Sequence, residues 1–559
     1  MVDLQNKIFY GIIKEFISEN KFQLLYLLLV STSISICHTY GISPYTSKTI
    51  DSVVNNKSNI WKSFVGFSLA YLLYQFLYYL FYQIKSVLVN RIKPWARYKL
   101  MHMILDVNTQ RLSQMNFTKL NSPIHRISDL ISIIVENTVA YFIPNVIFVI
   151  IIGIYFLFIN PVISMIFVIG NFIASVYYYF IFNKILEKNI KYEKSFQDSD
   201  GLIIDLLNNM DKVIVRGKVD QESKNFKNIS EENELKAIDY YASMNKEASF
   251  MSLIILITFL VTVSSLIYMR MNEQIDNIQF LTSLTVLMLF REKLVFVIET
   301  MPEYIGYIGR MKVAVNSLKD VESYYDDIQE NKRDLNSKKY KIAFEKIEFK
   351  NITFSYKSKE NTIQNKNVSF VSKGNEILGI VGPSGTGKTT FVKLLLKLYP
   401  DYSGQILIDD VNIRKLDPLY IRENITYVSQ TGKLFDKKII ENMFYGCDNK
   451  GKCMDLLLKI FHNKTIQNLF KNIDIVNDRA GLLGENLSGG QRQVINLIEG
   501  LLSPSKILIL DEPTNALDKK LKKEIIKLIR DCKQYKSTII IISHDRDVFS
   551  IFDKTIQIQ

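Results

Sequence analysis

The sequence predicts two unlike parts, an all-α six-helix transmembrane domain followed by an α/β domain. Three observations predict this division. The apolar residues are concentrated in the first 300 positions, which contain long windows without Asp, Glu, Lys or Arg. Glycine is distributed the other way, since 14 of the 23 glycines follow residue 331. In the second part, short apolar runs lead into glycine-rich or acidic turns, which is typical of buried parallel strands.

Composition limits the class of protein further. A chain of 559 residues is long enough for two to four domains, and its 48% apolar and 22% charged residues exclude a disordered or collagen-like chain. The net charge of +13 is compatible with nucleic acid, anionic lipid or the basic loops of a membrane protein. The four cysteines form no CxxC pair, so we expect free thiols in a reducing compartment.

The membrane spans are predicted from windows without charge, because a spanning helix needs about 20 mostly apolar residues. Five spans follow from the windows Phe22 to Ser47, Ser63 to Ile84, Asn137 to Asn183 and Ala248 to Met269. The third window is long enough for two spans, and Asn160-Pro161 marks a turn near its middle. A weaker sixth span starts at Asn277 and is interrupted by Arg291, Glu292 and Lys293.

Charge in the loops predicts the orientation of these spans. Residues 85–136 hold eight Lys or Arg against three Asp or Glu, so the positive-inside rule places this loop in the cytosol. Six spans then place both termini and the α/β domain in the cytosol, although the host membrane stays open. Because basic loops account for the net charge, we expect a lipid bilayer and no nucleic acid as partner.

Four segments follow from these patterns. Residues 1–20 carry apolar side chains at i, i+4 spacing, which suits a surface helix lying on the membrane or docked on protein. Residues 21–318 form the transmembrane domain. Residues 319–341 form a linker in which twelve of 23 residues are charged. Residues 342–559 form the α/β domain.

The α/β domain contains a phosphate-binding motif near its start. The apolar run Ile377 to Val381 suits a buried strand, GPSGTGKTT follows it, and the next apolar residues keep helical spacing. Strand, glycine-rich loop and helix together identify a P-loop NTPase. Lys388 would reach the β- and γ-phosphates, and the Thr389 hydroxyl would ligate magnesium. The residues expected around the phosphates are Gly382, Pro383, Ser384, Gly385, Thr386, Gly387, Lys388, Thr389 and Thr390.

A second apolar run, ILILDE, ends in two acids at Asp511 and Glu512. We expect a parallel strand next to the P-loop strand, with Asp511 near the magnesium. Glu512 could polarise an attacking water as general base. A helix cap or a solvated turn is the alternative interpretation of such a pair.

The string LSGGQ lies between these motifs, at Leu487 to Gln491. A serine and two glycines before a helix can bind phosphate, and they can equally cap the helix alone. With GPSGTGKTT, LSGGQ and LILDE in this order after six predicted spans, the chain resembles the ATP-binding cassette (ABC) transporters. It resembles more narrowly the exporter-type half-transporters that include multidrug, peptide and lipid exporters. The resemblance covers essentially the whole chain.

This resemblance implies ATP and Mg²⁺ as cofactors and assigns further residues. Tyr356 in FSY would stack on adenine, and Gln430 in YVSQ would ligate magnesium beside Thr389 and Asp511. His544 in IISHD would contact the γ-phosphate, as the catalytic partner of Glu512. The residues that would face the ATP held by a second chain are Ser488, Gly489, Gly490 and Gln491.

Pairing of two chains is also implied by the resemblance, because each ATP of the family lies between one P-loop and the other chain's LSGGQ. We expect a homodimer, with a heterodimer of two half-transporter chains as alternative. Its function would be ATP-driven export of an unidentified substrate, with coupling through short helices near residues 116–122 and 205–212.

The altered segment Val494 to Gly500, where the family carries arginines, keeps a second function open. This is an ATP-binding regulatory or channel-like membrane protein, or the weakly hydrolysing half of a heterodimer.

Two interpretations remain for Arg291, Glu292 and Lys293, which lie about 20 Å into the sixth span at roughly 1.5 Å per residue. These charges could line the transport pathway and select an ionic or zwitterionic substrate. Alternatively, the helix already emerges there into the cytosolic leaflet.

Overall fold

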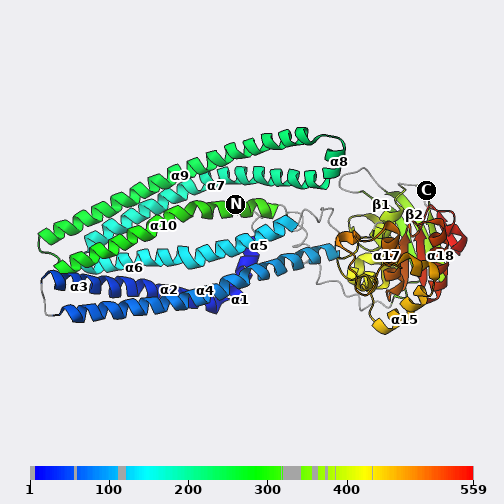
Figure 1. Ribbon diagram of the computed structural model, residues 1–559, viewed down its shortest axis with the longest axis horizontal. Helices are drawn as coiled ribbons and strands as arrows, with labels where there is room; N and C mark the ends of the chain where they lie inside the picture. Colours follow the sequence, from blue (N-terminus) through cyan, green and yellow to red (C-terminus); the bar gives the residue numbers. More distant parts are fainter. Residues whose placement is uncertain are drawn as a thin grey trace. The chain divides into compact units, whose positions relative to one another are not determined.

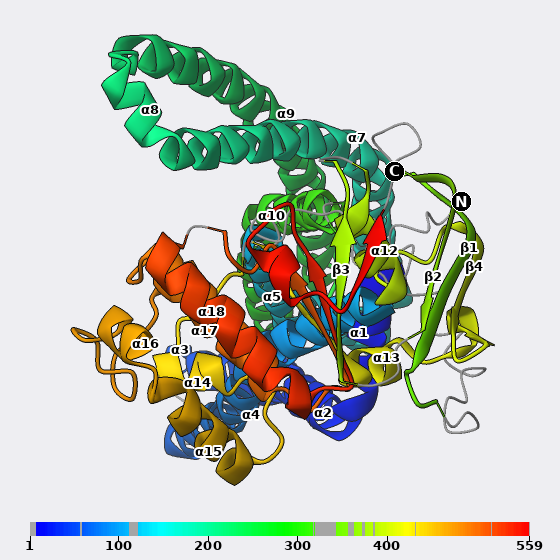
Figure 2. The same cartoon turned by 90° about the vertical axis from the view of Figure 1, so that its right-hand side faces the viewer.

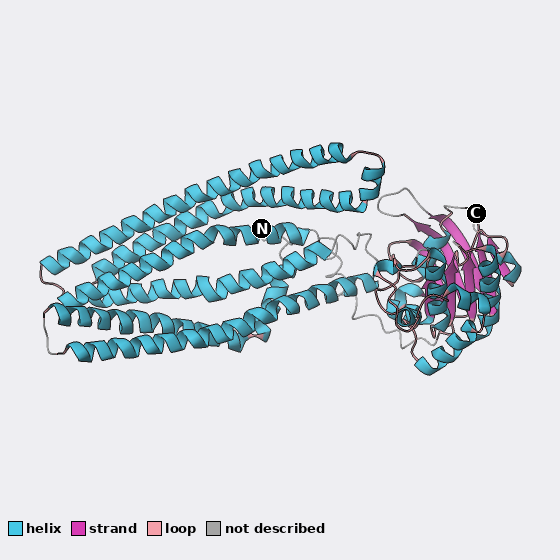
Figure 3. Ribbon diagram, viewed as in Figure 1, coloured by secondary structure: helices cyan, strands magenta, loops and turns pink. Residues whose placement is uncertain are grey.

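The computed structural model describes residues 7–55, 59–110, 121–316, 318, 342–355, 363–371, 375–383, 386–430, 432–515 and 517–557. The chain divides into two compact units. In the described residues of the first unit the regular elements are helices, and the strands lie in the second unit (Figure 3). The expected linker, residues 319–341, lies outside the described residues, as does most of the expected coupling segment 116–122.

Long helical rods that run side by side build the first unit (Figure 1). They are α2–η2–α3 (Lys21–Ile36, Cys37–Ile42, Ser43–Val54), α4 (Ile60–Gln110), α5–η4–α6 (Asn121–Glu136, Asn137–Phe142, Ile143–Ile159), α7 (Pro161–Asn208), α9 (Val219–Met271) and α10 (Asn277–Asn316). Within the described residues, five rods are long and apolar enough to cross a membrane: 21–54, 60–106, 124–159, 161–208 and 219–271. The rod α10 is not among them, so the sixth span stays a prediction.

The turn at Asn160 divides the charge-free window as the sequence predicts. Asn160 adopts an extended conformation (φ −159°, ψ 128°), and its side chain accepts a hydrogen bond from the Val162 backbone amide. Pro161 occupies the first position of α7, where its missing N–H costs no helical hydrogen bond. The rods α6 and α7 therefore meet at a single-residue connection.

A hairpin of α7 and α9 extends beyond the charge-free windows and carries the short helix α8 (Met210–Val215) at its tip (Figure 1). The sequence predicts a short helix at 205–212, and the helix observed lies a few residues later. Every described side chain of α8 is at least partly exposed, including Ile214 and Val215.

The N-terminal helix α1 (Lys7–Glu19) packs against protein along one face. Ile12 and Phe16 are buried, and the Phe16 ring meets the edge of Trp95 in α4 at 5.3 Å between centroids. The Trp95 indole N–H donates to Glu19 at 2.9 Å. Of the two interpretations of residues 1–20, docking on protein accounts for this face.

The second unit contains a five-stranded parallel sheet in the order β6-β7-β8-β3-β9. Its strands are β3 (Glu376–Val381), β6 (Ile425–Val428), β7 (Ile507–Asp511), β8 (Thr538–Ile542) and β9 (Lys554–Gln557). The expectation that β7 lies next to the P-loop strand is wrong, because β8 pairs with both β3 and β7. All three strands nevertheless end at the same edge of the sheet.

Both faces of this sheet are buried, which explains why its strands are continuous apolar runs. In β7, Ile507 and Ile509 pack into one core cluster, whereas Leu508 and Leu510 pack into the other. Successive side chains of a strand point to opposite faces, so each apolar strand contributes side chains to both core clusters.

Antiparallel strands and helices cover the two faces of the parallel sheet (Figure 2). The antiparallel sheet has the order β2-β1-β4-β5, with β1 (Lys346–Phe354), β2 (Ile363–Val371), β4 (Ser403–Ile408) and β5 (Val411–Asn412). The helices are α12 (Lys388–Leu395), α13 (Pro418–Asn424), α14 (Ile439–Met443), α15 (Lys450–Phe461), α16 (Lys464–Leu469), α17 (Gly489–Leu502) and α18 (Lys519–Asp531).

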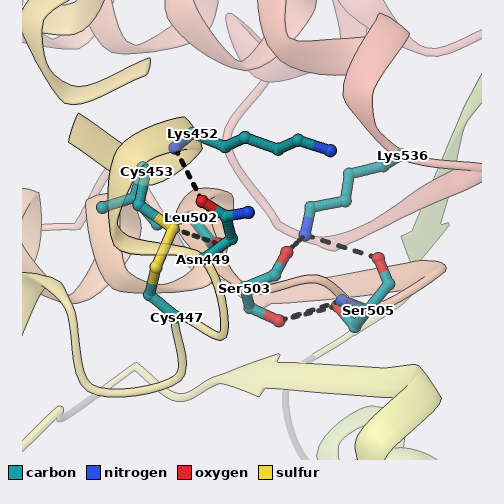
Figure 4. Close-up of a disulfide and its surroundings, with 8 residues drawn as sticks. All are labelled: Cys447, Asn449, Lys452, Cys453, Leu502, Ser503, Ser505 and Lys536. Carbon is teal, nitrogen blue, oxygen red and sulfur yellow. Dashed lines mark hydrogen bonds between the residues drawn. A yellow bond between two sulfur atoms is a disulfide. The ribbon is translucent and has the colours of Figure 1, made fainter. Parts of the chain in front are cut away.

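A disulfide joins Cys447 to Cys453 at the start of α15 (Figure 4). The expectation of four free thiols is therefore wrong for this pair, while Cys37 and Cys532 are free. The folded chain brings the two Cα atoms to 6.5 Å, a separation that a disulfide spans. Burial raises the pKa of the Cys532 thiol to about 11, which keeps it protonated and unreactive.

Candidate functional site

The P-loop connects β3 to α12, as the sequence predicts. Gly387 precedes the helix with φ +88°, a conformation that favours glycine, and Thr386 donates to the Pro383 carbonyl at 3.0 Å. The Lys388 ammonium donates to the carbonyls of Gly382 and Pro383 at 2.8 and 2.7 Å. A cation and the first amides of α12 thus lie together where an anion can bind. Ser384 and Gly385 lie outside the described residues.

Asp511 ends β7 beside the first turn of α12. The Thr389 hydroxyl donates to Asp511 Oδ2 at 2.8 Å, and the Tyr427 hydroxyl donates to the same oxygen at 2.9 Å. A hydroxyl and a carboxylate at this distance are hard oxygen donors of the kind that Mg²⁺ prefers. Among the described residues no group of three or more His, Cys, Asp or Glu could hold a metal, so this pair fits an ion that keeps water and phosphate ligands.

The Glu512 carboxylate follows Asp511 and makes three contacts with Ser543 and His544. Its Oε1 accepts from the His544 backbone amide at 3.2 Å and lies 2.6 Å from His544 Nδ1. Its Oε2 accepts from the Ser543 hydroxyl at 3.3 Å. Glu512 has φ +51°, a left-handed conformation that a residue other than glycine adopts at some cost. The backbone conformation and the three contacts hold a buried carboxylate at the edge of the sheet. Glu512 is therefore not part of a solvated turn, which is one alternative interpretation of this acidic pair.

His544 lies two residues after β8, and its imidazole is largely exposed while Glu512 is buried. The structure thus brings the two proposed catalytic residues into direct contact, although 32 positions separate them. Asp545, the next residue, accepts from Thr514 and Lys522. Burial acts to raise the pKa of Asp545, but these two partners hold it below its usual value. The loops after β7 and β8 are therefore joined by further contacts beside the one between Glu512 and His544.

Gln430 lies two residues after β6, at the same edge of the sheet, and is exposed. Tyr427, three residues earlier in the strand, turns inward to Asp511 instead. Three residues at the site carry no prediction from the sequence: Tyr427, Ser543 and Gln493. The side-chain amide of Gln493 donates to the Glu512 backbone carbonyl at 3.3 Å. The only signal of these three residues in the sequence is nearness to a motif residue.

Ser488 caps α17, and Gly489 and Gly490 form the first positions of the helix. The Ser488 hydroxyl accepts from the Gln491 backbone amide at 3.3 Å, while the Gln491 side chain accepts from the Ser488 amide at 2.8 Å. In the described part of the chain, no hydrogen bond joins these residues to the P-loop. Both interpretations of LSGGQ are compatible with this geometry, because a reciprocal cap also presents free amides to an outside anion. Tyr356 lies outside the described residues.

A second candidate site is a cavity of about 650 Å³ among α7, α9 and α10. Tyrosines and neutral polar groups line much of it, including Tyr240, Tyr241 and Tyr307, and Glu303 and Arg310 contribute one charge of each sign. The Arg310 guanidinium donates to the buried Glu193 carboxylate at 2.7 Å. Large aromatic walls with a few fixed polar groups are typical of small-molecule sites.

Of the three charged residues at positions 291–293, Lys293 lies in different surroundings from the other two. The helix α10 continues through residues 291–293 without a break, and the Lys293 ammonium lies 4.2 Å from the centre of the Phe148 ring in α6. Arg291 and Glu292 are exposed on this chain. Only Lys293 therefore faces the helical bundle.

Two family models match the chain, the ABC transporter transmembrane region over residues 25–294 and ABC transporter over residues 365–515. The chain is 35% identical to ABC transporter B family member 26, chloroplastic, of Arabidopsis thaliana over 216 residues. It is 33% identical to the ATP-dependent lipid A-core flippase of Haemophilus influenzae over 215 residues. These matches cover 38% of this chain and only 30% and 36% of the relatives.

A solved structure shares the fold of the whole chain. It is the structure of a bacterial Atm1-family ABC exporter with ATP bound, with a TM-score of 0.76 and 19% sequence identity. The likeness covers 97% of this chain and 94% of the exporter. A transmembrane helical domain followed by an ABC ATPase domain is thus confirmed as the fold class.

Proposed function

The chain belongs to the ABC transporter family, and from this premise we propose that it hydrolyses ATP with Mg²⁺ to export a substrate across a membrane. The convergence of Lys388, Thr389, Asp511, Glu512 and His544 at one edge of the parallel sheet supports this proposal. In this proposal Lys388 supplies a positive charge for the phosphates, and Thr389 and Asp511 supply metal ligands. The other two side chains supply the general base and a contact to the γ-phosphate.

The role of each side chain follows from its surroundings. Lys388 exchanges its two carbonyl partners for phosphate oxygens when ATP binds. Bound Mg²⁺ would neutralise phosphate charge from the position beside Thr389, Asp511 and Gln430. The Glu512 carboxylate accepts a proton from the attacking water, and its contacts with Ser543 and His544 fix its orientation.

The first experiment measures ATP hydrolysis by the full chain in lipid nanodiscs. Glu512→Gln keeps the volume of the side chain and removes the base, so we expect hydrolysis to fall by about 100-fold or more while ATP still binds. Glu423→Gln, on α13 and exposed, is the matched control and should hydrolyse ATP like the native chain. Equal rates of the native chain and Glu512→Gln, with ATP bound by both, would contradict hydrolysis at this site.

We further propose that two copies of the chain pair head to tail, so that Ser488–Gln491 of one copy faces the ATP on the P-loop of the other. This arrangement is supported by the backbone amides at the start of α17, which make no hydrogen bond to the described residues of their own chain's P-loop. The test mixes two inactive chains, Lys388→Ala and Ser488→Arg. Only a mixed dimer holds one intact site, so about a quarter of the native rate should return.

Failure of this mixture to recover activity, when each chain alone is folded and dimeric, would contradict head-to-tail pairing. A native chain that binds ATP and stays monomeric would point instead to a heterodimer with another half-transporter. Both outcomes can be read from the same preparation by mass photometry and hydrolysis.

We assign the cavity lined by Tyr240, Tyr307 and Arg310 to the exported substrate, which stays unidentified. Lys293 supports the hypothesis that charge in the pathway selects an ionic or zwitterionic substrate, because it faces the bundle. Lys293→Met should then lower the stimulation of hydrolysis by anionic amphiphiles and leave basal hydrolysis unchanged. The proposed orientation places both termini and the ATPase domain in the cytosol.

The alternative function is an ATP-binding regulatory or channel-like protein, or a weak half of a heterodimer. Its support in the sequence is the altered segment Val494 to Gly500. In the structure Val494 and Ile498 belong to the core beneath α17, a packing role that leaves the contacts of Glu512 intact. Negligible hydrolysis by a dimeric native chain would favour this alternative.

A further inference from the structure

One face of α17 contacts the carboxyl ends of two neighbouring strands of the parallel sheet, β6 and β7. Gln493 donates to the Glu512 carbonyl, and Asn496, one turn later, lies against the loop that follows Gln430. Gly500, a further turn along, allows Val428 of β6 to approach closely. Residues three and four apart share a helix face. The helix α17, which Ser488 caps, therefore contacts both the loop that begins at Glu512 and the loop that contains Gln430.

Asn496 occupies the space that a side chain at position 432 would need. A Cβ built on Gly432 would lie 2.0 Å from Asn496 Nδ2 and 2.4 Å from Asn496 Cγ. The φ angle of Gly432 lies outside the left-handed region, so the backbone conformation does not require glycine there. Space for Asn496 is therefore the reason for this glycine.

The amide of Asn496 has an unused donor. Asn496 is 6% exposed, and its Nδ2 has no hydrogen-bond partner among the described residues. A buried N–H without an acceptor destabilises a fold, so its presence next to a functional loop calls for an explanation. The Asn496 Nδ2 atom lies next to Gly432, two residues from Gln430.

We propose that Asn496 is a positioning residue for Gln430. Its side chain fills the notch at Gly432 and fixes where the loop leaves β6, and its amide donates to the loop backbone when Gln430 turns toward the metal. Through α17, the same contact ties the position of Gln430 to that of Ser488. This inference rests on the proposed function, because it assigns Gln430 to the magnesium.

The test measures the Mg²⁺ concentration at half-maximal ATP hydrolysis for Asn496→Ala, Gly432→Ala and the double variant. We expect Asn496→Ala to raise this concentration about fivefold or more and to change binding of metal-free ATP less than twofold. Gly432→Ala should show a similar or larger shift. The double variant should lie closer to the native chain than Gly432→Ala, because removal of the amide makes room for the new methyl group.

Gly446→Ala is the matched control, since its Cβ would meet only Ser503, at 3.9 Å, and φ is ordinary. Melting temperatures separate a folding defect from a shifted metal requirement. An unchanged Mg²⁺ requirement in Asn496→Ala, or simple additivity in the double variant, would overturn the inference. If the native chain binds ATP without hydrolysing it, the Mg²⁺ dependence of binding of a fluorescent ATP analogue gives the same comparison, so this result is separate from failure of the proposed function.

Discussion

The Thr389 hydroxyl and the Tyr427 hydroxyl both donate to one oxygen of Asp511, Oδ2, at 2.8 and 2.9 Å. Thr389 belongs to α12, the helix after the P-loop, whereas Tyr427 belongs to β6, the strand next to β7. The carboxylate is therefore oriented by one proposed metal ligand and by the tyrosine of YVSQ, to which the sequence assigned no role. Partners of this kind tune a metal ligand without touching the metal.

Tyr427→Phe should accordingly raise the Mg²⁺ concentration at half-maximal hydrolysis by about tenfold, because Asp511 loses an orienting donor. The affinity for metal-free ATP should change little. Tyr420→Phe, on α13, is the control, since its ring packs on Phe344 away from Asp511. A titration of hydrolysis against Mg²⁺ at saturating ATP measures the shift, and identical curves for the two variants would contradict this role.

We expect His544→Ala to lower kcat by about 100-fold with little change in KM for ATP, because the variant removes a contact to Glu512, the proposed general base. Ser543→Ala removes only the longer bond to Glu512 Oε2 and should have a smaller effect. Steady-state kinetics of both variants give the comparison. A rise in KM without a fall in kcat for His544→Ala would assign His544 to ATP binding instead.

Much of the parallel sheet could be predicted because its strands are buried on both faces. The runs ILGIV, ILILD and TIIII are uninterrupted apolar segments that end in the motif residues. Their order could not be predicted, because strand order depends on crossovers and not on the sequence of any one strand. This is why β8 appears between β3 and β7 against expectation.

The parts of the site that were missed depend on contacts between distant segments. Tyr427 reaches Asp511 across 84 positions and Gln493 reaches Glu512 across 19, and no local pattern encodes either contact. The Cys447–Cys453 disulfide was missed for a different reason. Six positions separate the two cysteines, and only the loop between α14 and α15 decides whether their Cα atoms approach.

Glu499 makes stability depend on pH. Burial raises the pKa of this carboxyl from 4.5 to about 7, so the folded state binds a proton more tightly than the unfolded state. The free energy of unfolding should therefore fall as pH rises from about 4.5 to about 7, by up to about 3 kcal/mol, and stay constant above. Glu499→Gln should melt at a higher temperature than the native chain at pH 8 and at the same temperature at pH 4.5. Equal melting temperatures of Glu499→Gln and the native chain at pH 8 would contradict the raised pKa of Glu499.

The disulfide predicts a count of reactive thiols. Alkylation of the denatured chain without reductant should label two cysteines, Cys37 and Cys532, and four after treatment with dithiothreitol. Closing so short a loop should stabilise the ATPase domain by about 2 kcal/mol, so Cys453→Ser should lower its melting temperature only without reductant. Cys532→Ser provides the control for loss of a thiol. Four labelled cysteines without reductant would show that the pair is reduced.

Glu193 and Arg310 link α7 to α10 at the cavity, and their pairing predicts an asymmetric response to mutation. Arg310→Met leaves the buried Glu193 carboxylate without its cation and should destabilise the helical unit by about 3 kcal/mol. Glu193→Gln leaves a cation that is half exposed and should cost less. The double variant Glu193→Gln/Arg310→Met removes both charges and should recover most of the stability lost by Arg310→Met. Thermal unfolding of the full chain in detergent ranks the three variants, and a double variant no more stable than Arg310→Met would mean that packing by the arginine, and not its charge, holds the two helices together.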